Sequence, residues 1–249
     1  MRITVVGGTG LIGTRLVRRL RADGHYVVAA SRATGVNSYT GENLAEALAG
    51  AEAVIDVSNS SYLDERGAQE FFYGSTLNLL TYGAAAGVPH HVALSIVGTD
   101  RLAAQQGGYF IAKVQQQRLI AESGRPYTIV HATQFFEFLP QIANYATHRG
   151  TARVGDLLIQ PMAADDVAAA VAVCVARAPA NAIVENGGPE IFDLADLLRR
   201  DLRFRRDDRD VIPDPLGTYF GADVGRRDLL PGPGATLAAT RFAQWQEAA

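Results

Sequence analysis

The sequence predicts an α/β protein with a Rossmann-like, doubly wound parallel sheet. Short apolar runs alternate with helical stretches through the first half, and a glycine-rich turn follows the first run. The apolar runs also end in small or polar residues, namely Gly7, Ser31, Ser58, Ser95 and Thr133. Right-handed crossovers would place helices on both faces of the sheet and bring these strand ends to one edge, where such sheets bind ligands.

Five buried strands are predicted in this half. They are Ile3–Val6, Tyr26–Ala30, Ala53–Val57, His91–Ser95 and Tyr127–Ala132. A helix from Leu11 carries its apolar residues on one face, and further helices are predicted at Leu44–Leu48, Gln69–Ala86 and Tyr109–Ser123. The four helices are each followed by a glycine suited to a left-handed helix end: Gly24, Gly50, Gly87 and Gly124.

The alternation weakens after residue 150. Helices are predicted at Ala164–Arg177 and Asp193–Arg200, and the charged run RFRRDDRD from Arg203 is interpreted as a solvated face. The last 40 residues are rich in proline and glycine, which predicts loops. We therefore expect residues 1–150 to form the nucleotide-binding core. Residues 151–249 should complete the fold and supply a small, loop-rich C-terminal substrate region.

The composition excludes several partner classes. A net charge of −3 gives no basic field for nucleic acid or anionic lipid, so neither is expected as a partner. The single cysteine, Cys174, cannot form an internal disulfide, which favours a reduced, cytoplasmic setting. The apolar run 167–178 is too short to span a bilayer, and the N-terminus does not resemble a signal peptide. Monomer and homodimer both remain open.

The glycine-rich turn has the sequence GGTGLIG, residues 7–13, between a strand and a helix. Gly7 permits the tight turn, Gly10 lets the backbone approach a pyrophosphate, and Gly13 permits close packing of helix on strand. The helix N-terminus offers free N–H groups and partial positive charge to the phosphates. Dinucleotide contacts are expected from Gly7, Thr9, Gly10, Leu11, Ile12 and Gly13.

The end of the second strand indicates the type of dinucleotide. NAD sites usually place Asp or Glu there, against the ribose 2′-hydroxyl, whereas this chain has Ser31 and Arg32. A guanidinium and a hydroxyl suit a 2′-phosphate, which favours NADP(H) over NAD(H). Val57 and Ser58, at the end of the third strand, are expected to line the same cofactor. Neighbouring Asp56 would either contact the adenine side or cap a turn.

Tyr109 and Lys113 stand four residues apart at the start of a predicted helix. Lys113 is the only lysine among 23 lysine and arginine residues, so this position is expected to need an ammonium. A neighbouring lysine favours phenolate and lowers a tyrosine pKa, and it can also hydrogen-bond a nicotinamide ribose. Tyr109 is thus the candidate acid/base for hydride transfer, with Ser95 holding the same substrate oxygen.

These motifs resemble the atypical short-chain dehydrogenase/reductases. The likeness rests on GGTGLIG, LSIVG and GYFIAKVQQQRLIAESGRPYTIVHATQFFEF, and it is strongest to NmrA-like NAD(P)-binding proteins and their quinone-reductase-like relatives. It covers about residues 1–175. The resemblance implies a Rossmann fold, NADP(H), and Ser95, Tyr109 and Lys113 in the catalytic positions. It also implies that Ala132, Thr133 and Phe135 border the nicotinamide and the substrate. His131 departs from the Arg that many relatives carry, and is interpreted as a tolerated replacement.

Three functions stay open at this level. The favoured one is an NADP(H)-dependent oxidoreductase that acts on a small carbonyl or quinone compound, apolar or aromatic in character. The others are a non-catalytic redox sensor and a lyase or epimerase that uses the cofactor without net redox change. No metal site is expected, because His90-His91 has no ligand cluster at suitable spacing and is interpreted as turn and edge. The aromatic stretch 134–138 is interpreted as core or as a substrate wall.

Overall fold

The computed structural model describes residues 1–60, 64–104 and 108–248. These residues form two compact units that alternate along the chain. Unit 1 comprises residues 1–95, 108–131 and 167–184, and unit 2 comprises residues 96–107, 132–166 and 185–249. The predicted division at residue 150 instead treats the chain as two continuous stretches. All the catalytic and cofactor-binding residues predicted from the sequence lie in these described parts.

A parallel sheet confirms the predicted fold class. Its strand order is β12-β9-β5-β4-β3-β1-β2, in which β1 pairs in parallel with β2 and β3, and β3 pairs in parallel with β4. The bounds are β1 Arg2–Val6, β2 Tyr26–Ala30, β3 Ala53–Asp56, β4 His91–Ile96, β5 Tyr127–Ala132, β9 Ile183–Gly187 and β12 Thr236–Leu237. The sequence did not predict β9 or β12.

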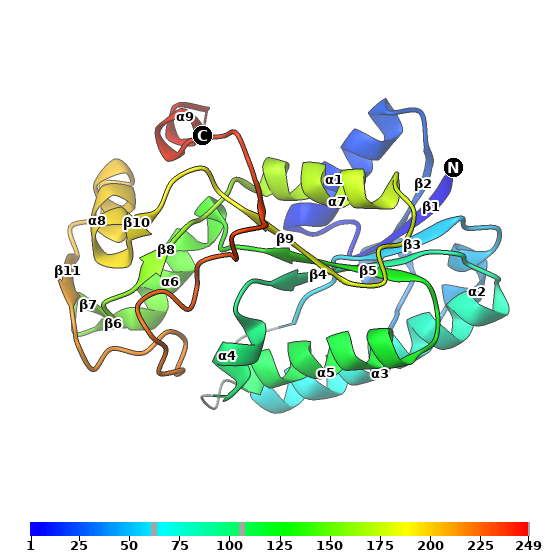
Figure 1. Ribbon diagram of the computed structural model, residues 1–249, viewed down its shortest axis with the longest axis horizontal. Coiled ribbons are helices and arrows are strands. Elements are labelled where there is room, and N and C mark those ends of the chain that lie inside the picture. Colours follow the sequence, from blue (N-terminus) through cyan, green and yellow to red (C-terminus); the bar gives the residue numbers. More distant parts are fainter. Residues whose placement is uncertain (61–63, 105–107, 249) are drawn as a thin grey trace. The chain divides into compact units, whose positions relative to one another are not determined.

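Helices cover both faces of the sheet in unit 1. Figure 1 shows α1 and α7 on one side, and α3 and α5 on the other. The bounds are α1 Leu11–Ala22, α2 Leu44–Leu48, α3 Glu65–Ala85, α5 Gly108–Glu122 and α7 Ala164–Val175. All four helix-ending glycines adopt the predicted positive φ, between 67° and 84°. The ends of these helices were therefore predictable from the positions of the glycines, because glycine adopts a positive φ without steric strain.

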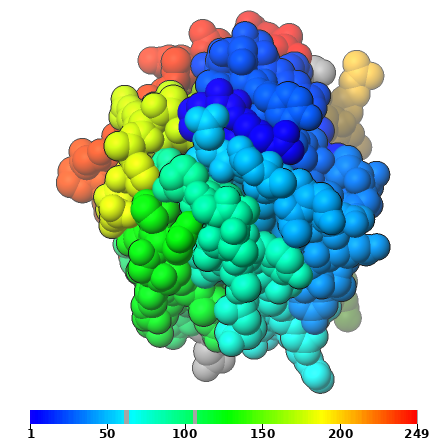
Figure 2. Space-filling model, turned by 90° about the vertical axis from the view of Figure 1, so that its right-hand side faces the viewer, coloured from blue at the N-terminus to red at the C-terminus, as the bar shows by residue number. Residues whose placement is uncertain are grey.

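Unit 1 combines segments that are far apart in the sequence. On the face in Figure 2, blue to cyan, green and yellow segments lie beside one another. Two backbone hydrogen bonds illustrate this, from His91 to Pro126 (3.0 Å) and from Ile129 to Ala182 (3.1 Å). The apolar side chains of β1, β3 and β4 form the centre of the core; Ile3, Val5, Ile55 and Val92 are completely buried.

Unit 2 holds short elements, most of which the sequence did not predict. Beside α8 Leu194–Phe204, close to the predicted helix, it contains α4 Thr99–Ala104, η2 Phe136–Phe138, α6 Leu139–Ala146 and α9 Phe242–Ala248. A three-stranded sheet joins β11 Asp210–Pro213, β7 Thr151–Val154 and β6 Thr147–His148, and a two-stranded one joins β10 Phe192–Asp193 and β8 Leu158–Ile159. None of the described helices is long and apolar enough to span a membrane.

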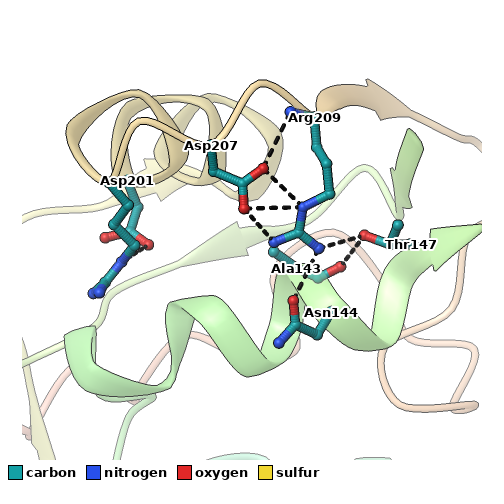
Figure 3. A network of polar contacts seen from close by, with 7 residues as sticks. Ala143, Asn144, Thr147, Asp201, Asp207 and Arg209 are labelled. Atoms are coloured by element: carbon teal, nitrogen blue, oxygen red, sulfur yellow. Dashed lines mark hydrogen bonds and ion pairs between the residues drawn. The ribbon is translucent and has the colours of Figure 1, made fainter. Parts of the chain in front are cut away.

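The charged run from Arg203 is only partly the predicted solvated face. Arg209 donates to Asn144 Oδ1 and Thr147 Oγ1, both at 2.9 Å, and pairs with Asp207 at 2.7 Å (Figure 3). Arg209 thus ties the segment after α8 to α6 and β6. This correction has a simple cause, because charge patterning does not reveal which arginine meets polar acceptors on another element.

Candidate functional site

The glycine-rich turn joins β1 to α1 and leaves the start of the helix open. Gly7 has φ +79° and donates to Ala30 O at 2.9 Å, and Gly10 then donates to Gly7 O at 2.9 Å. Gly10 is the N-cap of α1, without a side-chain cap, and the first turn contains no acidic residue. Thr9, Gly10 and Leu11 are exposed. Uncapped N–H groups at an exposed helix start are suited to bind phosphate.

Close backbone packing explains two of the predicted glycines. A Cβ on Gly7 would lie 2.7 Å from Ser58 N, so the turn rests directly on the end of β3. A Cβ on Gly13 would overlap Gly7 O, so α1 packs tightly on the turn. Ile12, by contrast, is buried with the apolar face of α1.

Ser31 and Arg32 follow β2 as predicted. Arg32 begins the short helix η1 (Arg32–Thr34) and is exposed, and no interaction of its guanidinium is found within the described part of the chain. Ser31 N donates to Thr34 Oγ1 at 2.9 Å, and the Ser31 side chain faces the backbone N–H of Thr34 in the return contact of a capping box. The exposed guanidinium of Arg32 is therefore the charged group that this strand end presents.

Asp56 caps the turn after β3. Its Oδ1 accepts hydrogen bonds from Ser58 N (2.9 Å) and Ser58 Oγ (2.6 Å), and its Oδ2 accepts one from Gln116 Nε2 (2.9 Å). Of the two interpretations of this carboxylate, the structure supports the turn cap. Asp56 is nevertheless 2% exposed, so a negative charge lies inside unit 1.

Lys113 is buried on α5, only 3% exposed. Its Nζ donates to Leu94 O (2.8 Å) and to Gln116 Oε1 (2.5 Å), and it lies 4.5 Å from the centre of the Phe72 ring. Burial lowers the pKa of Lys113 to about 8, against the raising effect of Asp56. An ammonium held by two acceptors retains a third N–H for another partner.

Tyr109 is buried one turn before Lys113, on the same helix. Its hydroxyl donates to Asn59 Oδ1 at 2.6 Å, and its ring packs edge-on against Phe72 with centroids 5.7 Å apart. Phe72, from α3, therefore contacts both members of the predicted pair. The structure brings Tyr109 and Lys113 to one place through this ring, in addition to their helical spacing.

Ser95 belongs to a second polar chain. Gln117 Nε2 donates to Ser95 Oγ at 2.8 Å, and Gln117 Oε1 lies 3.1 Å from His131 Nε2. Ser95 accepts in this contact, so its own hydroxyl proton stays available to another oxygen. His131 is itself buried at the end of this polar chain.

The segment from Ala132 to Phe135 lies in unit 2. Ala132 and Thr133 are buried; the Thr133 hydroxyl donates to Gln160 O at 2.7 Å. Phe135 is half-buried and packs edge-on against Phe138, whereas Phe136 is fully buried against Phe242 and Trp245. The aromatic stretch is therefore core at Phe136, and Phe135 keeps part of its surface exposed.

His90 and His91 correct one prediction. Both are buried, and β4 lies between β3 and β5, so His91 belongs to a central strand and not to an edge. Central strands carry apolar runs, and a histidine at the start of such a run gives no sign of its depth. Among the described residues, no group of His, Cys, Asp or Glu could hold a metal ion.

Sequence reasoning missed Asn59, Gln116 and Gln117. Gln116 and Gln117 stand three and four residues after Lys113, a spacing that places them on its side of the helix. Three glutamines in a row look like solvated decoration, yet Gln116 and Gln117 are buried while Gln115 is exposed. Asn59 is in a loop after β3, where no periodic pattern could have indicated its contact.

Residues 7–178 match the protein family described as NAD(P)H-binding, which is more than half of the chain. The chain belongs to this NAD(P)H-binding family. The match confirms the resemblance to atypical short-chain dehydrogenase/reductases. A family that binds NAD(P)H accounts for the open helix start and its glycines.

Two curated relatives are similar to this member of the NAD(P)H-binding family. It is 29% identical over 162 residues to photosystem II assembly factor Ycf39 of Synechocystis sp., covering 59% of this chain and 48% of the relative. It is 28% identical over 222 residues to the chloroplastic divinyl chlorophyllide a 8-vinyl-reductase of Oryza sativa subsp. indica, covering 75% and 54%. The chain thus spans about half the length of the curated relatives it matches.

Solved structures of the same fold align over nearly all of the chain. DesIV, a dTDP-glucose 4,6-dehydratase from Streptomyces venezuelae with NAD bound, has a TM-score of 0.74 at 20% identity, covering 98% of this chain and 94% of that one. MoeE5, in complex with UDP-glucose and NAD, has a TM-score of 0.71 at 20% identity, covering 98% and 91%. At these identities the likeness concerns the fold.

Proposed function

We propose that this chain is an NADP(H)-dependent oxidoreductase acting on a small molecule with a carbonyl or quinone group, apolar or aromatic in character. The strongest support is the pair Tyr109 and Lys113, buried on one helix and both in contact with the Phe72 ring. A lone surface tyrosine and lysine would have no such common contact. The 28% identity to a protein named a reductase points the same way.

Cofactor binding is proposed for the residues predicted from the sequence. The backbone of the glycine turn from Gly7 to Gly13 would hold the pyrophosphate, and Ser31 and Arg32 the 2′-phosphate. The exposed guanidinium of Arg32 supports NADP(H) over NAD(H). Val57, Ser58, Ala132, Thr133 and Phe135 are proposed to contact the remaining parts. When bound, the nicotinamide would supply or accept the hydride.

The chain's own residues would handle the proton and the substrate oxygen. In the reducing direction the Tyr109 hydroxyl gives its proton to the substrate oxygen, and in the oxidising direction the phenolate takes it back. Ser95 donates its free hydroxyl proton to the same oxygen. Lys113 directs its remaining N–H to the nicotinamide ribose, and its positive charge favours the phenolate.

A Tyr109→Phe variant tests this function. Oxidation of NADPH is followed by absorbance against a panel of quinones and aldehydes, with Tyr73→Phe, an exposed tyrosine on α3, as the matched control. We expect turnover to fall roughly 10²- to 10⁴-fold while NADPH binding is retained, because only the proton donor is lost. Unchanged turnover in Tyr109→Phe would contradict the acid/base role.

The likeness to a protein named an assembly factor favours a second candidate, an NADP(H)-binding protein without turnover. Such a sensor would bind NADPH, show strong preference for one redox state, and oxidise it with none of the panel. A lyase or epimerase would instead form product without consuming cofactor. The same assay, with product analysis, therefore separates the three functions.

A further inference from the structure

Gln116 is placed between the only lysine and a buried carboxylate. It lies on α5, 1% exposed, three residues after Lys113. Its Oε1 accepts from Lys113 Nζ at 2.5 Å and its Nε2 donates to Asp56 Oδ2 at 2.9 Å. Both ends of a buried side-chain amide are thus satisfied by groups of opposite charge, an arrangement that fixes the amide's orientation.

The rest of this network is also fixed. Asp56 Oδ1 is held by the backbone and hydroxyl of Ser58, and the second contact of Lys113 is the carbonyl oxygen of Leu94 in β4. Within the described residues, Lys113 has no direct ion pair. The carboxylate therefore reaches the ammonium through the amide, and the ammonium is directed by two acceptors from separate elements.

We propose that Gln116 is a positioning residue for Lys113, and that Asp56 acts through it as the counter-charge of this ammonium. Gln116 Oε1 and the carbonyl oxygen of Leu94 each accept one of the three N–H groups of Lys113. The direction of the third N–H group is thereby fixed. The network also explains why the position holds the chain's single lysine, since a planar guanidinium cannot take the place of a compact ammonium between these acceptors. The functional consequence rests on the proposed function, in which this third N–H meets the cofactor ribose.

The charge of Lys113 depends on this network. Burial holds the pKa of Lys113 at about 8, and Asp56 opposes that effect. Among the residues that the structure describes, Asp56 from β3 raises the pKa values of both Lys113 and His91 of β4, and Tyr109 lies one turn before Lys113 on α5. Removal of the Gln116 acceptor would leave a buried ammonium with one hydrogen bond, which favours the neutral amine.

The single lysine gives a direct measurement. Protein grown with carbon-13 labelled lysine has one lysine side-chain resonance, whose pH titration by NMR reports the pKa of Lys113 without assignment. We expect about 8 for the unchanged protein. Gln116→Met, which keeps the length and loses both hydrogen bonds, should lower this pKa. Gln116→Glu should raise it, because a carboxylate then faces the ammonium.

Opposite shifts for Met and Glu are the expected result, since a purely structural role for Gln116 would not reverse sign. Asp56→Asn provides an independent variant, and should lower the pKa even where Gln116→Met fails to fold. Gln115→Met, on the exposed side of α5, is the matched control and should leave the titration unchanged. The proposal is overturned by an unchanged pKa of Lys113 in both Gln116→Glu and Asp56→Asn, provided that circular dichroism shows both variants to be folded.

NADPH affinity against pH tests the part that rests on the proposed function. In the unchanged protein we expect the NADPH affinity to fall as the pH rises through about 8, where Lys113 loses its charge. In Asp56→Asn the same loss of NADPH affinity should begin at a lower pH. Shifted NMR titrations together with pH-independent NADPH binding would uphold the network and contradict the cofactor role of Lys113. The two failures are thereby distinguishable.

Discussion

Gly13 lies against the carbonyl oxygen of Gly7, closer than any side chain would permit. A Cβ at Gly13 would overlap that oxygen and lie 2.7 Å from Gly8 Cα, whereas a Cβ at Gly10 would meet only Gly7 O, at 3.3 Å. Two glycines of one motif thus serve different purposes. Gly13 is needed for packing of the fold, and Gly10 leaves space on the outer side of the turn.

These two glycines should separate folding from cofactor binding. Gly13→Ala should lower the free energy of unfolding by about 1–3 kcal/mol, because the backbone must shift to admit the methyl group. Gly10→Ala should leave stability nearly unchanged and weaken NADPH binding roughly tenfold or more, because the methyl blocks the approach of the pyrophosphate. Urea unfolding and NADPH fluorescence titration measure the two effects. Equal NADPH affinity in Gly10→Ala and the unchanged protein would contradict this division.

Arg32 should govern the choice between NADP(H) and NAD(H). Arg32→Ala should weaken NADPH binding by roughly 10- to 100-fold, since a hydrogen-bonded charge partner of the 2′-phosphate is lost. NADH binding should barely change, because NADH carries no such phosphate. Dissociation constants for both cofactors are the measurement, and Arg203→Ala, an exposed arginine on α8, is the control. A similar loss for NADH would show that Arg32 does not recognise the phosphate.

His91 should make the fold sensitive to acid. Burial lowers the pKa of His91 from 6.5 to about 4, and the nearby charge of Asp56 opposes this effect. Between these values the unfolded chain binds a proton that the folded chain does not, so stability is present above pH 6.5 and is lost as the pH falls towards 4. The contribution amounts to roughly 3 kcal/mol at most.

Urea unfolding of the unchanged protein and of His91→Gln, between pH 7 and pH 5, checks this expectation. The variant should lose less stability over that range than the unchanged protein, whatever its stability at pH 7. His148→Gln, which alters an exposed histidine, should follow the unchanged protein. Parallel pH dependences for His91→Gln and the unchanged protein would rule out His91 as the source.

Glu137 contacts two other residues of unit 2, Ala164 and Trp245. Its carboxylate accepts from Ala164 N at the start of α7 (3.0 Å) and from the indole nitrogen of Trp245 on α9 (3.0 Å). Glu137→Ala should cost about 1–2 kcal/mol of unfolding free energy, because it removes a helix cap and leaves the indole donor unpaired. Trp245 is the only tryptophan, so its emission should shift to the red as α9 loosens.

Fluorescence spectra and urea unfolding of Glu137→Ala measure the change in Trp245 emission and in unfolding free energy. Glu247→Ala, an exposed carboxylate on α9 itself, is the matched control and should leave both the emission and the stability unchanged. An unaltered Trp245 emission in Glu137→Ala would mean that packing against Phe136 and Phe242 holds α9 without the hydrogen bond.

The core strands, their helices and the glycine turn were predictable because each depends on residues that are close together in the sequence. Buried parallel strands need continuous apolar runs, helix ends need a residue that tolerates positive φ, and the phosphate turn needs glycines at fixed spacing. The first five strands therefore appear within one or two residues of their predicted bounds. The short strands and helices of unit 2 were missed, because strands of two to four residues and helices of three to eight residues carry too little periodicity.

By itself the sequence determined a Rossmann-like fold, a dinucleotide turn, and a tyrosine and a lysine on one helix. Only the tertiary structure decided what surrounds that pair, because side chains from β3, α3 and the loop before α3 meet α5 through packing. Asp56, Phe72 and Asn59 each contact this region from another part of the chain. The glutamine that joins Lys113 to Asp56 carries no sign of this role in the sequence, since a side chain's partners depend on what the fold places opposite it.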